Sequence, residues 1–135
     1  MPKIKLPAKM ENLQRLTQFV LQCAKGQGFD ERKLHAIELA TEEALVNIFR
    51  YAYPESGAGD VEVSCKMDNE SKFIMEFADA GIPFEIDSIA EPDLDASLSE
   101  RKVGGLGFFL IRKMVDDVQY RREGKMNFLT LTVRK

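Results

Sequence analysis

The sequence has no tryptophan, a single histidine and only two cysteines among its 135 residues. Cys23 and Cys65 are too few and too far apart for a disulfide framework or a cysteine zinc site, so we expect two reduced, packed cysteines. With His35 as the one histidine, hydrolase triads and histidine-ligated metal centres are disfavoured. No segment resembles a signal peptide and no apolar run could span a bilayer, which predicts a cytoplasmic protein without a membrane partner.

An excess of positive charge is also missing, because the formal net charge is −3. This argues against direct binding to the backbone of a nucleic acid. The 44% hydrophobic and 30% charged residues are ordinary for a globular protein, and no internal repeat or linker is visible. We therefore expect one domain, spanning residues 1–135, that is large enough to bury a core.

The hydrophobic pattern changes its period along the chain. Alternation predicts strands around residues 4–7, 61–67, 73–79, 118–122 and 129–133. Helical spacing predicts helices over residues 10–26, 30–51 and 104–115, the second of them capped by Asp30 and burying Leu34, Ile37, Thr41, Ala44, Leu45 and Ile48. These elements predict an α+β fold, a two-layer sandwich with about three helices on one face of a mostly antiparallel five-stranded sheet.

A glycine cluster precedes the third predicted helix, with Gly104, Gly105 and Gly107 inside four residues. A helix start carries free N–H groups and the positive end of the helix dipole, and glycines let an anion reach them. One interpretation is a phosphate cradle made by the amides of Gly105, Leu106 and Gly107. The other is a mobile loop that ends in an ordinary helix start, and this stretch alone favours neither. The long acidic stretch from Gly81 to Lys102 has no clear period and is typical of a functional lid.

Glu43 and Asn47 lie four residues apart on the second helix and so project from the same face, beside the apolar stripe. A carboxamide oxygen suits Mg²⁺, and a nearby carboxylate can accept a proton from water or a hydroxyl. Taken alone, the pair is better explained by a solvated glutamate and an asparagine bonded to a neighbouring loop, because such pairs are common on helices.

Asp79, Ala80 and Gly81 follow the second strand of a predicted hairpin, where an aspartate before a glycine often marks only a turn. The sharper interpretation is adenine recognition. A buried carboxylate accepts a hydrogen bond from the exocyclic amine of adenine, whereas guanine would present a carbonyl oxygen and leave the carboxylate unpaired.

The order of these three motifs resembles the GHKL ATPase superfamily and, within it, the small anti-sigma-factor serine/threonine kinases. The segment from Glu43 to Asn47 is similar to the N box of the family, residues 79–81 to its first glycine box and residues 104–111 to its second. The resemblance implies a Bergerat ATP-binding fold with a lid at residues 84–103. It also implies that Glu43 is the general base, that Asn47 holds Mg²⁺, that Asp79 with Gly81 binds adenine, and that Gly104, Gly105, Leu106 and Gly107 bind the phosphates of ATP.

The resemblance further implies a cytoplasmic, Mg²⁺-ATP-dependent serine/threonine protein kinase of a partner-switching module. Such a kinase phosphorylates an anti-sigma-factor antagonist, binds a sigma factor or another target in a second state, and forms a homodimer. The alternative is an ATP-binding switch that regulates a partner without phosphotransfer. Two positions differ from the usual pattern of the family. Pro83 replaces the second glycine of the first glycine box, and Arg50 stands where a histidine is frequent.

Overall fold

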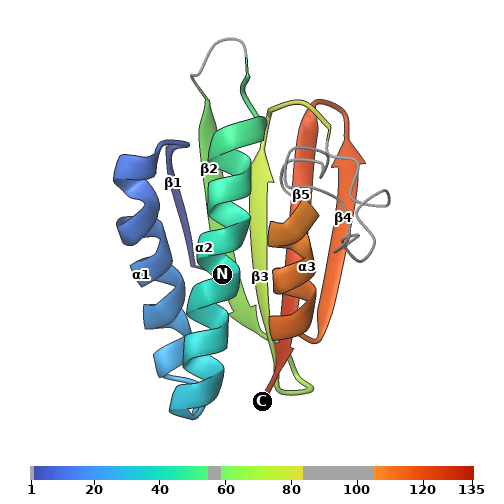
Figure 1. Ribbon diagram of the computed structural model, residues 1–135. Helices are drawn as coiled ribbons and strands as arrows, with labels where there is room; N and C mark the ends of the chain where they lie inside the picture. Colours follow the sequence, from blue (N-terminus) through green and yellow to red (C-terminus); the bar gives the residue numbers. More distant parts are fainter. Residues whose placement is uncertain (1, 55–58, 84–104) are drawn as a thin grey trace.

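A computed structural model describes residues 2–54, 59–83 and 105–135 (Figure 1). Its five strands form a single sheet in the order β1-β2-β3-β5-β4, and every neighbouring pair is antiparallel. The predicted α+β fold is confirmed. In chain order, the elements are β1 (Lys3–Pro7), a 3₁₀ turn (Met10–Asn12), α1 (Leu13–Lys25), α2 (Glu31–Tyr51), β2 (Asp60–Met67), β3 (Lys72–Asp79), α3 (Gly105–Met114), β4 (Asp117–Glu123) and β5 (Met126–Arg134).

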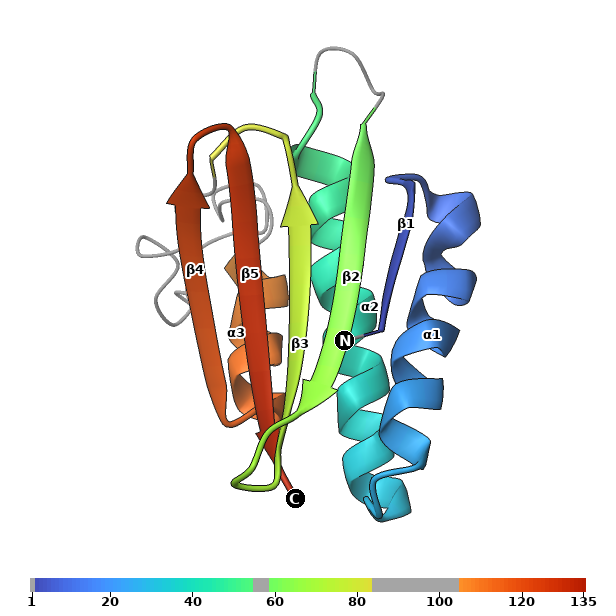
Figure 2. The ribbon, with the colours of Figure 1, turned by 180° about the vertical axis from the view of Figure 1, so that it is seen from behind.

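The described α-helices all lie on one face of the sheet, and Figure 2 shows the opposite face of the strands open from behind. Along β3 and β5 the side chains alternate between buried and partly exposed, as the period-two pattern predicts. None of the helices in the described part of the chain is long and apolar enough to cross a bilayer. The two-layer sandwich predicted from the sequence is therefore the observed architecture.

Local chemistry explains where the first two helices start. The side chain of Asp30 accepts a hydrogen bond from the backbone N–H of Lys33 at 2.8 Å, so this residue caps α2 as predicted. The first helix begins at Leu13 and not at Met10, because residues 10–12 form a tighter 3₁₀ turn. Asn12 donates its side-chain N–H to the carbonyl of Pro7 at 2.8 Å and so ties that turn to β1.

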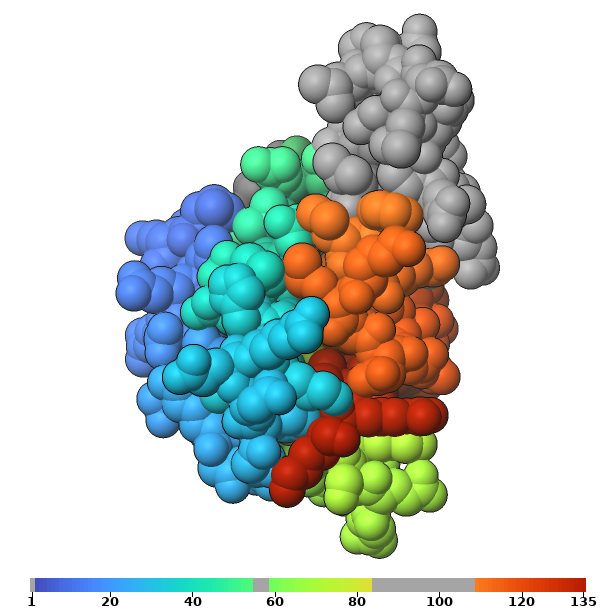
Figure 3. Space-filling view, turned by 60° about the horizontal axis from the view of Figure 1, so that its bottom comes forward, coloured from blue at the N-terminus to red at the C-terminus, as the bar shows by residue number. Residues whose placement is uncertain are grey.

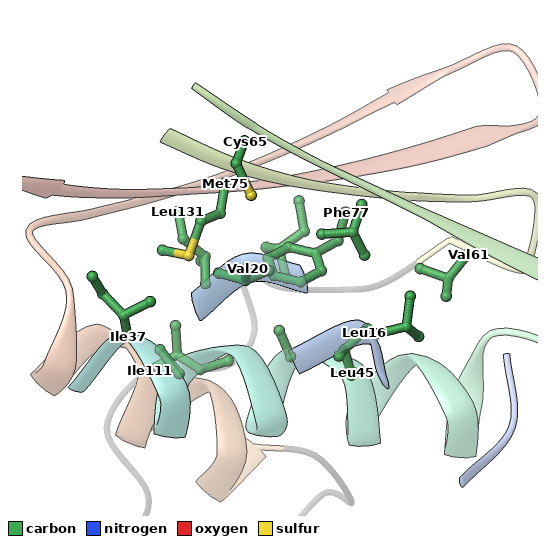
Figure 4. Packing of buried hydrophobic residues seen from close by; sticks show 14 of the residues in the cluster. Leu16, Val20, Ile37, Leu45, Val61, Cys65, Met75, Phe77, Ile111 and Leu131 are labelled. Carbon is green, nitrogen blue, oxygen red and sulfur yellow. The ribbon is translucent and has the colours of Figure 1, made fainter. Parts of the chain in front are cut away.

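The core fills the space between the helices and the sheet (Figure 4). The predicted buried face of α2 is confirmed except at Leu34, which is only partly buried. Both cysteines are free, as expected, and burial raises the pKa of the Cys65 thiol. Fully buried side chains from all three helices meet those of the sheet, among them Leu16, Val20, Ile37, Leu45, Ile111, Val61, Met75, Phe77 and Leu131.

Different elements begin and finish at the two ends of the sheet. At one end, here called the Asp79 end, α2 and β3 finish and β2 and β5 begin (Figure 1). At the other, the Asp68 end, lie the β2–β3 turn, the C-terminus and the start of α2. Figure 3 shows the C-terminal residues against α2 there, where the Lys33 ammonium donates to the carbonyl of Arg134.

Candidate functional site

Asp79 is the last residue of β3 and one of the most deeply buried charged groups in the described structure, with 1% of its surface exposed. Its Oδ1 accepts two hydrogen bonds, from the backbone N–H of Gly81 at 2.9 Å and from Nδ2 of Asn127 at 2.8 Å. Within the described residues, Oδ2 receives none. One carboxylate oxygen is therefore held by the protein, and the other remains an acceptor for a ligand.

Burial raises the pKa of Asp79 above its ordinary value, because removing the carboxylate from water disfavours its charged form. The hydrogen bonds from Asn127 and Gly81 and the nearby guanidinium of Arg122 act in the opposite direction. The donors that position Asp79 are thus also the groups that favour its ionised form.

Asn127, at the start of β5, was not identified from the sequence. It is directly paired with Asp79 in the β3–β5 register and is 1% exposed. A signal was present, because Asn127 lies in the same alternation phase as Leu129, Leu131 and Val133, the buried face of the strand. A polar residue at a buried position requires hydrogen-bond partners. Here the partner across the sheet is Asp79, the residue that the sequence predicts to bind adenine.

The loop after β3 is fastened to the end of α2. The backbone N–H of Ile82 donates to the carbonyl of Ala52 at 2.9 Å, and a Cβ placed on Gly81 would lie 2.1 Å from that same oxygen. Gly81 is therefore required by a close backbone approach, which is the physical reason for a glycine in this motif. The contact connects the predicted adenine end of the site to the helix that carries Glu43 and Asn47.

Tyr53 makes a second connection at the same place. Its hydroxyl accepts the N–H of Ala80 at 2.9 Å and donates to the carbonyl of Asp60 at 2.6 Å. Burial raises the pKa of Tyr53, and the nearby negative charges of Asp79 and Asp60 add to the shift. The neutral hydroxyl, which can both donate and accept, is therefore the form that holds the loop.

Arg122, on β4, makes a third contact with the loop after β3, in addition to those from α2 and β5. Its Nη1 donates to the carbonyl of Gly81 at 2.6 Å and to Oδ1 of Asn127 at 3.0 Å. Residues 79–82, here called the Asp79 loop, are thus held by the end of α2, by β5 and by β4 at once. This arrangement orients Asp79 before any ligand arrives, which lowers the ordering cost of binding.

Glu43 and Asn47 share one face of α2, as predicted. Asn47 is more deeply buried than a core-edge position implies, with 5% of its surface exposed, and Glu43 is half-buried. Nδ2 of Asn47 donates to the backbone carbonyl of Glu43 at 2.8 Å, and its Oδ1 has no hydrogen-bond partner among the described residues. Asn47 lies one turn before the end of α2, near the Ala52 contact with the Asp79 loop.

The described residues contain no group of three or more His, Cys, Asp or Glu side chains that could hold a metal ion. A divalent ion at Asn47 would consequently take most of its ligands from water and from the phosphates of a bound nucleotide. Mg²⁺ commonly binds in this way, with one or two protein ligands. Oδ1 of Asn47, which has no hydrogen-bond partner among the described residues, fits such a site.

The predicted phosphate cradle falls at the start of α3, where Gly105, Leu106 and Gly107 form the first turn. Their N–H groups are among those that a helix start leaves without intrahelical partners. Ile111, one turn further on, is fully buried in the core and anchors α3 to the molecule. Gly104 and the predicted lid at residues 84–103 lie outside the described residues.

Comparisons with known proteins agree with the family resemblance. The profile of the histidine kinase-like ATPase domain family matches residues 6–133. Among curated proteins, the serine-protein kinase RsbW of Listeria monocytogenes is 30% identical over 128 residues, which cover 90% of this chain and 80% of that protein. The serine-protein kinase RsbW of Bacillus cereus (strain B4264) is 27% identical over 131 residues, covering 94% and 81%.

Solved structures support the fold. The RsbU and RsbW domains of a Mycobacterium tuberculosis protein match with a TM-score of 0.65 at 13% identity, over 99% of this chain but only 32% of the solved chain. The histidine kinase domain of a blue-light activated kinase from Erythrobacter litoralis matches with a TM-score of 0.55 at 15% identity, over 90% of this chain and 59% of the solved chain. At these identities the likeness concerns the fold alone.

Proposed function

The chain belongs to the histidine kinase-like ATPase domain family, and on that basis we propose that it is an ATP-dependent serine/threonine protein kinase of a partner-switching module. The relatives that carry the name serine-protein kinase RsbW align over most of the chain and support this choice within the family. The proposal treats residues 1–135 as one catalytic domain.

The observation that carries the proposal is the arrangement of Asp79. One of its oxygens is saturated by Gly81 and Asn127, and the other has no hydrogen-bond partner among the described residues. Its loop is fastened at Ala52 to the helix that presents Glu43 and Asn47. An adenine bound by the second oxygen would thus be held at a fixed position relative to both α2 side chains, as phosphoryl transfer requires.

In this proposal Glu43 accepts the proton of a serine or threonine hydroxyl as the hydroxyl oxygen attacks the γ-phosphorus of ATP. The bond from the γ-phosphorus to the bridging oxygen breaks, and ADP leaves. Asn47 holds Mg²⁺ through Oδ1, and the ion, when bound, neutralises phosphate charge. The amides of residues 104–107 hold the phosphates.

The substrate in this proposal is a small anti-sigma-factor antagonist protein, and a sigma factor is the target held in the other state. We further propose that the kinase acts as a cytoplasmic homodimer that contacts neither nucleic acid nor membrane. Light scattering of the purified protein tests the dimer, with a monomer mass as the result that would refute it.

The test compares Glu43→Gln with Glu42→Gln, its neighbour on α2, which is half-buried like Glu43. Each variant is incubated with Mg²⁺-ATP and the antagonist protein encoded beside the kinase, and phosphoserine and phosphothreonine are quantified by mass spectrometry. Loss of a general base lowers the transfer rate by about 10²- to 10⁴-fold. We expect that loss for Glu43→Gln alone, with ADP affinity preserved in both variants.

Equal transfer by Glu43→Gln and the wild-type protein would refute the role of Glu43. Tight ATP binding without transfer by any form would favour the alternative, an ATP-dependent switch that controls a partner without phosphorylating it.

A further inference from the structure

We propose that Asn127 is a positioning residue for adenine recognition. Its side-chain amide is fixed by Arg122 and Tyr120, and it holds Asp79 so that one carboxylate oxygen remains for the adenine ring. This inference rests on the proposed binding of an adenine nucleotide at Asp79. It gives a function to Tyr120 and Arg122 on β4 and to Asn127 on β5, none of which belongs to the recognised sequence motifs.

The orientation of the Asn127 amide follows from the chemistry of its neighbours. Arg122 can only donate, and its Nη1 lies 3.0 Å from Oδ1 of Asn127. The carbonyl of Ile82 can only accept, and it lies 2.8 Å from Nδ2. A flipped amide would place donor against donor and acceptor against acceptor, so only one orientation satisfies both neighbours.

In this orientation the amide has no capacity left for a ligand. Its two N–H groups serve Oδ1 of Asp79 and the carbonyl of Ile82, and its oxygen accepts from Nη1 of Arg122 and from the hydroxyl of Tyr120, the latter at 2.6 Å. Asn127 consequently acts through Asp79 and not on the nucleotide itself. Because its N–H group faces Oδ1, the oxygen that remains to accept from adenine is Oδ2.

The charges around Asp79 make this donor important. Arg122 approaches from β4, while Tyr53 beyond the end of α2 and Asp60 at the start of β2 lie on the other side. Burial disfavours the charged form of Asp79 and so raises its pKa. The hydrogen bond from Asn127 is the largest of the effects that lower this pKa. Replacing the amide by a carboxylate would turn a donor into an acceptor and face two negative charges across one hydrogen-bond distance.

The test measures the dissociation constant of ADP by calorimetry between pH 6 and pH 8, so that no phosphotransfer is needed. For Asn127→Asp we expect affinity to fall about 10- to 100-fold at pH 8, the loss of a hydrogen bond to a charged group. Affinity should recover as the pH falls, because one proton shared by the two carboxylates restores the bond to Oδ1. The wild-type protein should show no such recovery.

Asn69→Asp provides the matched control, because it makes the same change at an exposed residue of the β2–β3 turn, at the opposite end of the sheet. It should bind ADP as the wild-type protein does at every pH. Asn127→Asp with wild-type affinity and an unchanged pH profile would overturn the inference. Absence of ADP binding by the wild-type protein would instead refute the proposed function.

If Asn127→Asp fails to fold, as judged by circular dichroism, Arg122→Met provides the second test. This variant keeps the apolar stem of the side chain but removes the guanidinium donor from Oδ1 of Asn127 and from the carbonyl of Gly81, while Tyr120 still donates to Oδ1. ADP affinity should fall about 3- to 10-fold, less than for Asn127→Asp, because Arg122 donates to Asn127 and to the carbonyl of Gly81 and not to Asp79 itself. Its control is Arg121→Met, the next residue on β4, whose guanidinium pairs with Glu76 and Glu123. Equal ADP affinity in the two variants would also overturn the inference.

Discussion

Two aspartates, Asp68 before strand β3 and Asp79 at its last position, accept hydrogen bonds in the same way but lie in different surroundings. Oδ1 of Asp68 accepts backbone N–H groups of Glu70 at 2.8 Å and Lys72 at 2.9 Å. Oδ1 of Asp79 likewise accepts two N–H groups, from Gly81 and Asn127. Yet the pKa of Asp68 is lowered, chiefly by its bond from Lys72, whereas burial raises the pKa of Asp79.

The difference shows that the turn chemistry alone does not make a site. Asp68 is only partly buried, so water still solvates its charge, and its hydrogen bonds only close a turn. Asp79 is buried among elements that are distant in sequence, and Asn127 on β5 donates to one of its oxygens, while the other oxygen has no donor among the described residues. Burying a carboxylate is costly unless hydrogen bonds compensate for the lost hydration, and carboxylates with a perturbed pKa cluster at functional sites.

The largest effect that would sharpen this comparison is the loss of nucleotide binding in Asp79→Asn. The amide can keep its oxygen toward Gly81 and Asn127, so the donor –NH₂ replaces Oδ2 and faces the exocyclic amine of adenine. We expect ADP affinity to fall at least about 100-fold, because a donor now meets a donor where a charged acceptor was. Calorimetric titration with ADP measures the change.

Asp68→Asn makes the same replacement at the other end of β3 and should leave ADP affinity unchanged. Thermal unfolding of both variants checks that the fold persists. Unchanged ADP affinity in Asp79→Asn would mean that the adenine pocket lies elsewhere, and the comparison of the two aspartates would then carry no functional meaning.

Much of this site could be predicted from local sequence because its parts are local. The spacing of Glu43 and Asn47 on one helix, the glycine-led start of α3 and an aspartate at the end of a period-two strand are all visible in short windows. Helical and strand periodicity also predicted the order of layers. The predicted first helix started three residues early, since a 3₁₀ turn and an α-helix share the same short apolar pattern.

The network around Asp79 could not be predicted in this way, because it depends on strand register and not on spacing. Asn127 meets Asp79 only because β5 pairs with β3 in the observed register, and Arg122 reaches Gly81 only because β4 is the edge strand beside β5. The necessity of Gly81 likewise follows from its approach to Ala52, at the end of another element. The alternation pattern places the polar residue Asn127 on the buried face of its strand, but it does not identify the hydrogen-bond partner.

A second way to test the comparison is Gly81→Ala, whose Cβ would overlap the Ala52 carbonyl at 2.1 Å. The loop would have to move away from α2, which we expect to cost about 1–3 kcal/mol in the free energy of unfolding, as overpacking does. Urea unfolding measures this cost, and ADP affinity should fall with it because Asp79 belongs to the same loop.

Gly26→Ala is the control, since nothing lies within 4 Å of a Cβ at that position and its backbone is in the right-handed helical region. It should be neutral or stabilising by up to about 1 kcal/mol, because alanine restricts the unfolded chain more than glycine does. Equal stability of the two variants would contradict the close contact between the Asp79 loop and α2.

The smallest effect concerns how stability depends on pH at the two aspartates. The folded pKa of Asp68 lies below its ordinary value near 3.8, so this residue stabilises the protein above that pH and the contribution is lost as the pH falls through the folded value. The folded pKa of Asp79 lies above its ordinary value, so its contribution is greatest in acid and is lost as the pH rises through the folded value. Urea unfolding from pH 3 to pH 7 should therefore show the advantage of the wild-type protein over Asp68→Asn shrinking in acid, while Asp79→Asn gains on the wild-type protein as the pH rises. Difference curves with the same slope would mean that burial is not what separates the two aspartates.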